Sequence, residues 1–214
     1  KNDTIREAEN VRLGLPTFED EGMQDEPEPE SQKEEHQSYS VYEQAQRYRA
    51  AKAVLQDIYA LDAEHAEAVK ALEQLWEEGY TVAAHQLGKF YRDDLSTLRD
   101  HAKAEQWFRR SAEAGNDFSE YALGKLLLTQ KRWDEAMEWL DKAADHGSQF
   151  AQYRLGKIYL TGEFVPKDVE KALAYLTASA DQGNQFAQYT LGKLYLLGRD
   201  VPPDREQARE WLIR

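Results

Sequence analysis

The apolar residues of the chain recur with the period of amphipathic helices. One stripe at positions i, i+4, i+7 and i+8 consists of Ala151, Leu155, Ile158 and Tyr159. A second stripe consists of Ala172, Tyr175, Leu176 and Ser179. Asp168 stands where a helix N-cap belongs, and Gly183 stands where a helix would end. The pattern therefore predicts two helices joined by a loop from Gly162 to Asp168, which contains a glycine and a proline.

This helical hairpin is repeated along the chain. Residues 149–162 read QFAQYRLGKIYLTG and residues 185–198 read QFAQYTLGKLYLLG, with eleven of fourteen positions identical. Helix-ending glycines recur at Gly79, Gly115, Gly147 and Gly183. A Leu-Gly-Lys triplet follows each of them, with its glycine at Gly88, Gly124, Gly156 and Gly192. A column of alanines, each followed three residues later by an aromatic residue, consists of Ala104, Ala136, Ala172 and Ala208. One unit is four residues shorter, and the columns on either side place this deletion in the loop between Leu127 and Ala136.

The glycine of each triplet lies inside a predicted helix, where it costs roughly 1 kcal/mol relative to alanine. Its recurrence predicts a close approach by the facing helix, with the Trp or Tyr column lying across it. On this reasoning Gly156→Leu or Gly192→Leu destabilises the protein.

The units resemble the Sel-1-like repeat family, whose pattern is A-x-x-x-L-G-x-x-Y-x-x-G, then a V-x-x-D loop, then A-x-x-W and A-x-x-G. The matching residues in one unit are Ala151, Leu155, Gly156, Tyr159, Gly162, Val165, Asp168, Ala172, Tyr175, Ala180 and Gly183. The short unit departs from the pattern and looks more like a tetratricopeptide repeat. The resemblance implies an all-α fold, a right-handed alpha-alpha solenoid of helical hairpins, that acts as a protein-binding scaffold and not as an enzyme.

The predicted organisation is an acidic linker over residues 1–38 and a solenoid over residues 39–214. The units of the solenoid are residues 39–78, 79–114, 115–146, 147–182 and 183–214. In the linker, the spacing of Thr4 and Glu7 predicts a short helix reaching Leu13.

A narrower resemblance covers residues 176–212, which look like the carboxy-terminal repeats of bacterial mobilisation relaxases. It implies an alternative function, an accessory module that binds nucleic acid or assists a relaxase. The formal net charge of −13 opposes nucleic acid as a direct ligand, because phosphate contacts depend on positive charge. The acidic excess lies mainly in residues 1–40, which hold twelve Asp or Glu and four Lys or Arg.

Motifs for catalysis or cofactors are missing from the sequence. The five histidines lack metal-ligand spacing, and there is neither a phosphate-binding nor a dinucleotide-binding glycine motif. We therefore expect no cofactor and no metal. The chain contains no cysteine, which fits a cytoplasmic location, and no apolar run as long as the roughly 18 residues of a membrane helix.

The strongest candidate for a binding surface is a column of lysines, each four residues after a tyrosine or histidine. Its members are His85, Lys89, Tyr121, Lys125, Tyr153, Lys157, Tyr189 and Lys193. One interpretation is that the lysine stems pack over neighbouring rings while the amines stay in water. The other is that these residues form a basic and aromatic ladder on the concave surface, which would bind a peptide or a partner domain, including a part of its own parent chain.

The last repeat stops at Arg214, before the residues that close the other units. We therefore expect the chain to belong to a longer protein. Trp211 and Leu212 are predicted to lie on an incompletely covered apolar surface, through which the chain self-associates weakly.

Overall fold

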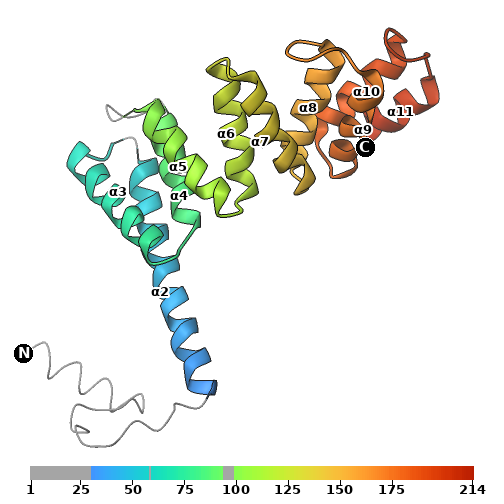
Figure 1. Ribbon diagram of the computed structural model, residues 1–214. Coiled ribbons are helices and arrows are strands. Elements are labelled where there is room, and N and C mark those ends of the chain that lie inside the picture. The colour runs from blue at the N-terminus through green and yellow to red at the C-terminus, as the bar shows by residue number, and fades with distance from the viewer. Residues whose placement is uncertain (1–29, 58, 94–98) are drawn as a thin grey trace, which may run out of the picture. The chain divides into compact units, whose positions relative to one another are not determined.

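The computed structural model describes residues 30–57, 59–93 and 99–214 of the chain (Figure 1). This part contains α-helices and no strand. The helices are α2 (Glu30–Gln56), α3 (Asp62–Glu77), α4 (Val82–Arg92), α5 (His101–Glu113), α6 (Asp117–Thr129), α7 (Trp133–Asp145), α8 (Gln149–Thr161), α9 (Val169–Asp181), α10 (Gln185–Leu197) and α11 (Arg205–Ile213). The chain divides into two compact units, residues 1–43 and residues 44–214.

The described part of the first unit is the beginning of α2. This helix starts at Glu30, inside the segment predicted as a linker, so residues 30–38 are helical. After Pro29 the sequence is rich in Glu, Gln and Lys, which are good helix formers, and it contains neither proline nor glycine up to the end of α2. The short helix predicted from Thr4 lies outside the described residues, and the linker role of residues 1–38 stays a prediction.

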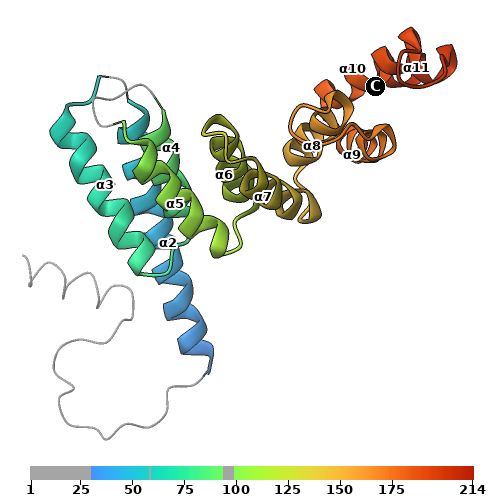
Figure 2. The same cartoon turned by 45° about the horizontal axis from the view of Figure 1, so that its top comes forward.

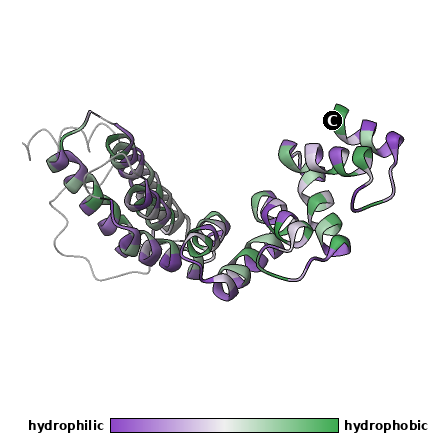
Figure 3. Cartoon of the chain, turned by 90° about the horizontal axis from the view of Figure 1, so that it is seen from above, coloured by the Kyte–Doolittle hydropathy of each residue, from purple (hydrophilic) through white to green (hydrophobic). Residues whose placement is uncertain are grey.

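The second unit is a series of helical hairpins. From α3 to α11, each helix packs against the next one along the chain, and the views in Figure 1 and Figure 2 show this order. The fully buried leucines come from both helices of the hairpins and include Leu72, Leu87, Leu123, Leu140, Leu155, Leu176 and Leu191. Figure 3 shows how polar and apolar residues alternate along the helices. The predicted hairpins, loops and all-α class are confirmed.

The helix-ending glycines close the second helix of each hairpin with one backbone arrangement. Gly183 has φ +89°, a left-handed conformation that favours glycine. Its N–H donates to the carbonyl of Ala180, and the N–H of Asn184 donates to the carbonyl of Ser179. These two bonds form a Schellman motif, which satisfies carbonyls that the helix end leaves free. The same arrangement recurs at Gly79, Gly115 and Gly147.

The glycines inside the first helices do mark a close approach, but the predicted partner is wrong. A Cβ atom on Gly156 would lie 2.7 Å from Cγ of Leu176, the residue after the aromatic Tyr175. The other three glycines face Phe108, Leu140 and Leu212 in the same way. The reason is the rotation of α9 about its axis, which places Leu176 and not Tyr175 against Gly156. The residue four positions after the column alanine is turned by about 40° from it, whereas the aromatic residue, three positions after, is turned by about 60° to the other side.

The deletion in the short unit lies in the loop, as predicted, because α6 ends at Thr129 and α7 begins at Trp133. Lys131 takes a left-handed conformation in this loop, with φ 63°. In the longer loops of the next two units, glycines hold the left-handed position directly after the first helix, at Gly162 and Gly198.

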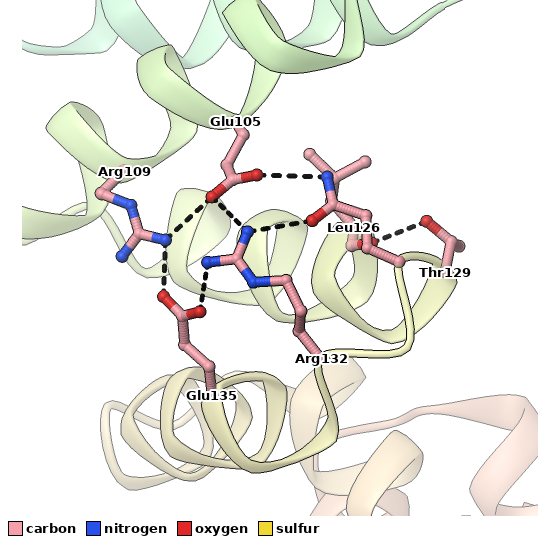
Figure 4. A network of polar contacts seen from close by, with 7 residues as sticks. Glu105, Arg109, Leu126, Thr129, Arg132 and Glu135 are labelled. Carbon is pink, nitrogen blue, oxygen red and sulfur yellow. Dashed lines mark hydrogen bonds and ion pairs between the residues drawn. The ribbon is translucent and has the colours of Figure 1, made fainter.

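A network of ion pairs joins the hairpin of α4 and α5 to the hairpin of α6 and α7 (Figure 4). Arg109 on α5 donates to Glu105 at 3.0 Å and to Glu135 on α7 at 2.6 Å. Arg132 binds the same two carboxylates. The hydrogen bond from Arg109 lowers the pKa of Glu135 below its ordinary value.

Candidate functional site

The predicted ladder residues lie on the first helices of four successive hairpins: α4, α6, α8 and α10. In each helix the tyrosine or histidine and its lysine are four residues apart, so they occupy the same face on adjacent turns. The structure adds a third column to this face, which the sequence reasoning missed. It consists of Phe118, Phe150 and Phe186, with Val82 at the equivalent position of α4.

These phenylalanines pack against the ladder residue of the preceding hairpin. Tyr121 contacts Phe150, and Tyr153 contacts Phe186, in both cases with ring centroids 6.0 Å apart. His85 contacts Phe118 with centroids 6.3 Å apart. The three phenylalanines are nevertheless 60%, 45% and 69% exposed, in the order Phe118, Phe150 and Phe186. Their repetition three residues before each ladder tyrosine was the sequence signal for an exposed phenylalanine column.

A groove of about 400 Å³ lies between α8 and α10. Five of its lining residues come from the ladder and the phenylalanine column: Tyr153, Lys157, Phe186, Tyr189 and Lys193. Apolar side chains on its wall include Leu160, Leu194 and Leu197, and two charged residues, Arg199 and Asp200, lie at the loop end. We name this cavity groove 1.

A second groove of about 450 Å³ lies in the equivalent place between α6 and α8, and we name it groove 2. Tyr121, Lys125 and Tyr153 line it, so Tyr153 belongs to both grooves. Its loop end is closed by Phe164, whose ring stacks on Trp133 with centroids 4.2 Å apart and an interplanar angle of 17°. Groove 2 is also lined by Leu128, Thr129, Arg154 and Glu163.

The two grooves are locally basic, although the protein is acidic. Their cations are Lys125, Arg154, Lys157, Lys193 and Arg199, against the carboxylates Glu163 and Asp200. Asp200 is bound by Lys167, which lies outside both grooves. Among the described residues, neither Lys125 nor Lys193 forms an ion pair or places its ammonium over a ring, and both are exposed. These groups can therefore bind acidic side chains of another molecule.

The first ladder position differs from the others. His85 and Lys89 line neither groove, and Nδ1 of His85 lies 2.7 Å from Oγ of Ser119 on the next hairpin. Burial, together with the nearby Lys89 and Arg92, lowers the pKa of His85 to about 4. His85 is therefore neutral at pH 7 and joins two hairpins, and the ladder residues that line grooves 1 and 2 begin with Tyr121.

A model of the Sel1 repeat family matches residues 81–116, 134–148, 149–184 and 185–214, more than half of the chain. The chain belongs to the Sel1 repeat family. Residues 117–133, which contain α6 and the shortened loop, are outside the match, in agreement with the predicted departure of this unit from the Sel1 pattern. Sel1 repeat proteins generally act as protein-interaction scaffolds, and the family is generally non-catalytic.

Several solved structures are similar to this chain. A Sel1 repeat protein from Oxalobacter formigenes is 31% identical over 78% of this chain and 70% of its own, with a TM-score of 0.67. The protective antigen c5321 of uropathogenic Escherichia coli is 27% identical over 78% of this chain and 37% of its own, with a TM-score of 0.67. The immunity protein Pa5087 from Pseudomonas aeruginosa is 27% identical over 79% of this chain and 63% of its own, with a TM-score of 0.53. The chain thus spans less than two thirds of the last two proteins.

The comparisons do not support the narrower resemblance to relaxases. The search of curated proteins found no match to this chain. Across the part of the chain that the structure describes, no group of three His, Asp or Glu could hold a metal ion. In the same part, every helix is too short or too polar to cross a membrane.

The last hairpin leaves apolar surface uncovered, as predicted for Leu212, which is 46% exposed. Its equivalent in the preceding repeat, Leu176, is fully buried. Trp211 is half-buried, with the Arg214 guanidinium 4.4 Å from its ring centroid. Self-association through this end stays a prediction.

Proposed function

We propose that this Sel1 protein binds an extended segment of a partner protein along the first helices of its hairpins, in grooves 1 and 2. The observation that carries the proposal is that six of the predicted ladder residues line two equivalent, adjacent grooves. They are Tyr121, Lys125, Tyr153, Lys157, Tyr189 and Lys193. His85 and Lys89 are not part of the proposed surface.

The lining defines the chemistry of the bound segment. Exposed aromatic rings such as Phe186 and Tyr189 bury apolar side chains and serve as anchors in protein interfaces. The lysine ammonium groups favour Asp and Glu of the partner and steer its approach. A segment that alternates apolar and acidic side chains therefore fits these grooves, and volumes of 400 and 450 Å³ accommodate individual side chains of it.

A nucleic-acid-binding accessory module is the second candidate, because aromatic rings beside lysines can also bind single strands. The excess of cations in the grooves favours it, and the net charge of −13 opposes it. A protein segment requires fewer positive charges, since its apolar side chains contribute to binding. We therefore place the protein segment first.

The test is a selection of displayed random 16-residue peptides on the intact chain, followed by affinity measurements. We expect selected peptides to be rich in acidic and apolar residues. Their affinity should fall at least about fivefold for Lys157→Glu/Lys193→Glu and for Phe186→Gln, since interface anchors contribute about 1 kcal/mol or more. The matched control is Arg205→Glu/Arg209→Glu, which changes the charge equally at exposed sites on α11 outside both grooves.

Two results would contradict the proposal. The first is that the selected peptides bind the groove variants and the control equally well. The second is that single-stranded oligo(dT), added at moderate salt, binds the protein, displaces the peptides and loses affinity in the groove variants, which would favour the nucleic-acid module.

A further inference from the structure

The Trp or Tyr column, three residues after the column alanines, has a cation over its ring in three of its four members. Arg110 lies over Trp107 at 4.7 Å, Lys142 over Trp139 at 4.1 Å, and Arg214 over Trp211 at 4.4 Å, measured from the cationic atom to the ring centroid. In each pair the cation follows the ring by three residues, so the two side chains are neighbours on one helix face. The remaining repeat, on α9, has Tyr175 as the ring and the exposed Ala178 in place of the cation.

A cavity of about 450 Å³ lies beside this tyrosine. It is lined by Asp141 and Asp145 from α7, Tyr159 from α8, and Lys171, Ala174 and Tyr175 from α9. The rings of Tyr159 and Tyr175 are stacked, with centroids 6.0 Å apart and an interplanar angle of 8°. None of these residues lines groove 1 or groove 2.

Lys171 does not replace the missing cation. Its ammonium lies over Tyr159 at 5.2 Å, just as Lys103 lies over Tyr91 at 5.1 Å in an earlier repeat. This lysine therefore belongs to the contact with Tyr159, which is separate from the contact between a cation and the Trp or Tyr column. With two carboxylates and one ammonium, the cavity lining carries one uncompensated negative charge.

The last repeat shows what occupies the equivalent position. There Arg214 donates to Asp181 at 2.9 Å while its guanidinium lies over Trp211. Asp181 is the repeat equivalent of Asp145, since each stands two residues before a helix-ending glycine. The carboxylate and the ring of the completed site are therefore both present at the cavity, as Asp145 and Tyr175.

A further carboxylate, Asp141, lies beside this ring, at a position that is Thr177 in the next repeat. The hydroxyl of Tyr175 donates to Oδ1 of Asp141 at 3.2 Å, which holds the ring and this carboxylate together. Burial, reinforced by the neighbouring Asp145, raises the pKa of Asp141 above its ordinary value. The nearby Lys171 and the hydrogen bond from Tyr175 oppose this rise without cancelling it.

We propose that the cavity between α7 and α9 binds an arginine side chain of a partner protein, in the place that Arg214 occupies in the next repeat. A planar guanidinium can lie on an aromatic ring and donate to a carboxylate in the same pose, which the compact ammonium of lysine does less well. The site is separate from the peptide grooves, and its assignment does not rest on them.

The experiment is an NMR titration of the full chain with N-acetyl-arginine amide, with N-acetyl-citrulline amide as the neutral isostere. A single side chain binds with a Kd in the millimolar range, so titration to about 50 mM reveals it. We expect saturable shifts of the Asp145 and Tyr175 amides with the arginine compound only. Asp141→Asn/Asp145→Asn should weaken binding about tenfold, because the aromatic rings alone hold an exposed cation weakly.

Ala178→Arg is the decisive variant, since it supplies the missing cation from the chain itself. It should weaken probe binding about tenfold, while Ala178→Gln, which has a long neutral side chain, should leave binding unchanged. The proposal is overturned if citrulline produces the same shifts, if Ala178→Arg binds the probe like the unaltered protein, or if no saturable shift appears. The far-ultraviolet circular dichroism of each variant confirms that it is folded.

Discussion

The substitution Gly156→Ala tests whether the repeated glycine permits close packing between α8 and α9. Gly156 is buried within α8, and an added Cβ would lie 2.7 Å from Cγ of Leu176 and 3.2 Å from its backbone nitrogen. Neither of these atoms is the free end of a side chain, and Leu176 is fully buried. The methyl group therefore enters only if α9 moves away from α8.

Two opposing effects decide the outcome. Alanine is favoured over glycine inside a helix by about 1 kcal/mol. Overpacking a filled interior costs typically about 1–3 kcal/mol. With a fixed neighbour at Leu176 the second effect dominates, so we expect a net loss of about 1 kcal/mol in the free energy of unfolding. For a chain of this length, this corresponds to a melting temperature lower by about 2–4 °C.

Gly192→Ala is the matched control, with the same substitution at the equivalent position of α10. Its new Cβ would lie 2.5 Å from Cγ of Leu212 and 3.3 Å from the backbone oxygen of Ala208, but Leu212 is 46% exposed near the end of α11, so its side chain can rotate away into solvent. Here helix propensity should prevail, leaving the stability unchanged or slightly raised. Thermal and urea unfolding followed by circular dichroism measure both variants, and hydrogen exchange of α8 and α9 amides locates the effect. If Gly156→Ala is as stable as the unaltered protein, or more stable, the close-packing explanation of the glycine column is wrong.

Three further predictions concern other parts of the structure. The pKa of His85 is about 4 in the folded protein and 6.5 ordinarily, so its contribution to stability is complete above pH 6.5 and lost as the pH falls toward 4. Across this range, urea unfolding should show a free energy of unfolding that falls by about 1–3 kcal/mol more than in the control His85→Tyr/Ser119→Ala. Equal pH dependence in the two proteins would contradict this prediction. Lys131 has φ 63°, a left-handed conformation that glycine adopts without strain, so Lys131→Gly should raise the free energy of unfolding by up to about 1 kcal/mol. The control Lys131→Ala should not raise it. Equal unfolding midpoints for the two variants would show that the backbone is not strained. Arg109→Met should cost about 1 kcal/mol in urea unfolding at low salt and less at 1 M salt, since Arg109 joins Glu105 to Glu135; a loss that is independent of salt would indicate packing instead.

The repeat and its hairpins could be predicted from the sequence because they follow from spacing. The period of the apolar stripe, the glycines and the loop deletion all have a direct consequence for the backbone. The residue across Gly156 could not be chosen in this way. Tyr175 and Leu176 are adjacent, and which of them faces α8 depends on how far α9 is rotated about its axis, which the packing of both helices decides.

The candidate site was predictable in part for a similar reason. The same-face placement of Tyr153 and Lys157 follows from their spacing of four residues. The phenylalanine column that includes Phe186 could have been recognised from its repetition, but its exposure and its contact with Tyr153 depend on how α10 packs on α8. The stacking of Trp133 on Phe164 joins a helix start to a loop of the next repeat, so it depends on the loop conformation and has no signal in the spacing.

Two positions at which one repeat differs from the others, His85 and Ala178, are of different kinds. His85 replaces a tyrosine, and the residue it meets on the next hairpin is Ser119, where the later repeats have Ala151 and Ala187. The polar ring is thus matched by a polar partner, as a buried hydrogen-bonding group requires, and the pair maintains the fold. Ala178 stands where three other repeats have a cation, whereas the ring of Tyr175 and the carboxylate of Asp145 have counterparts in those repeats and line the cavity. The change at His85 is matched by Ser119 and preserves packing. The change at Ala178 is not matched in this way, so the proposal is that Tyr175 and Asp145 bind a side chain from another molecule instead.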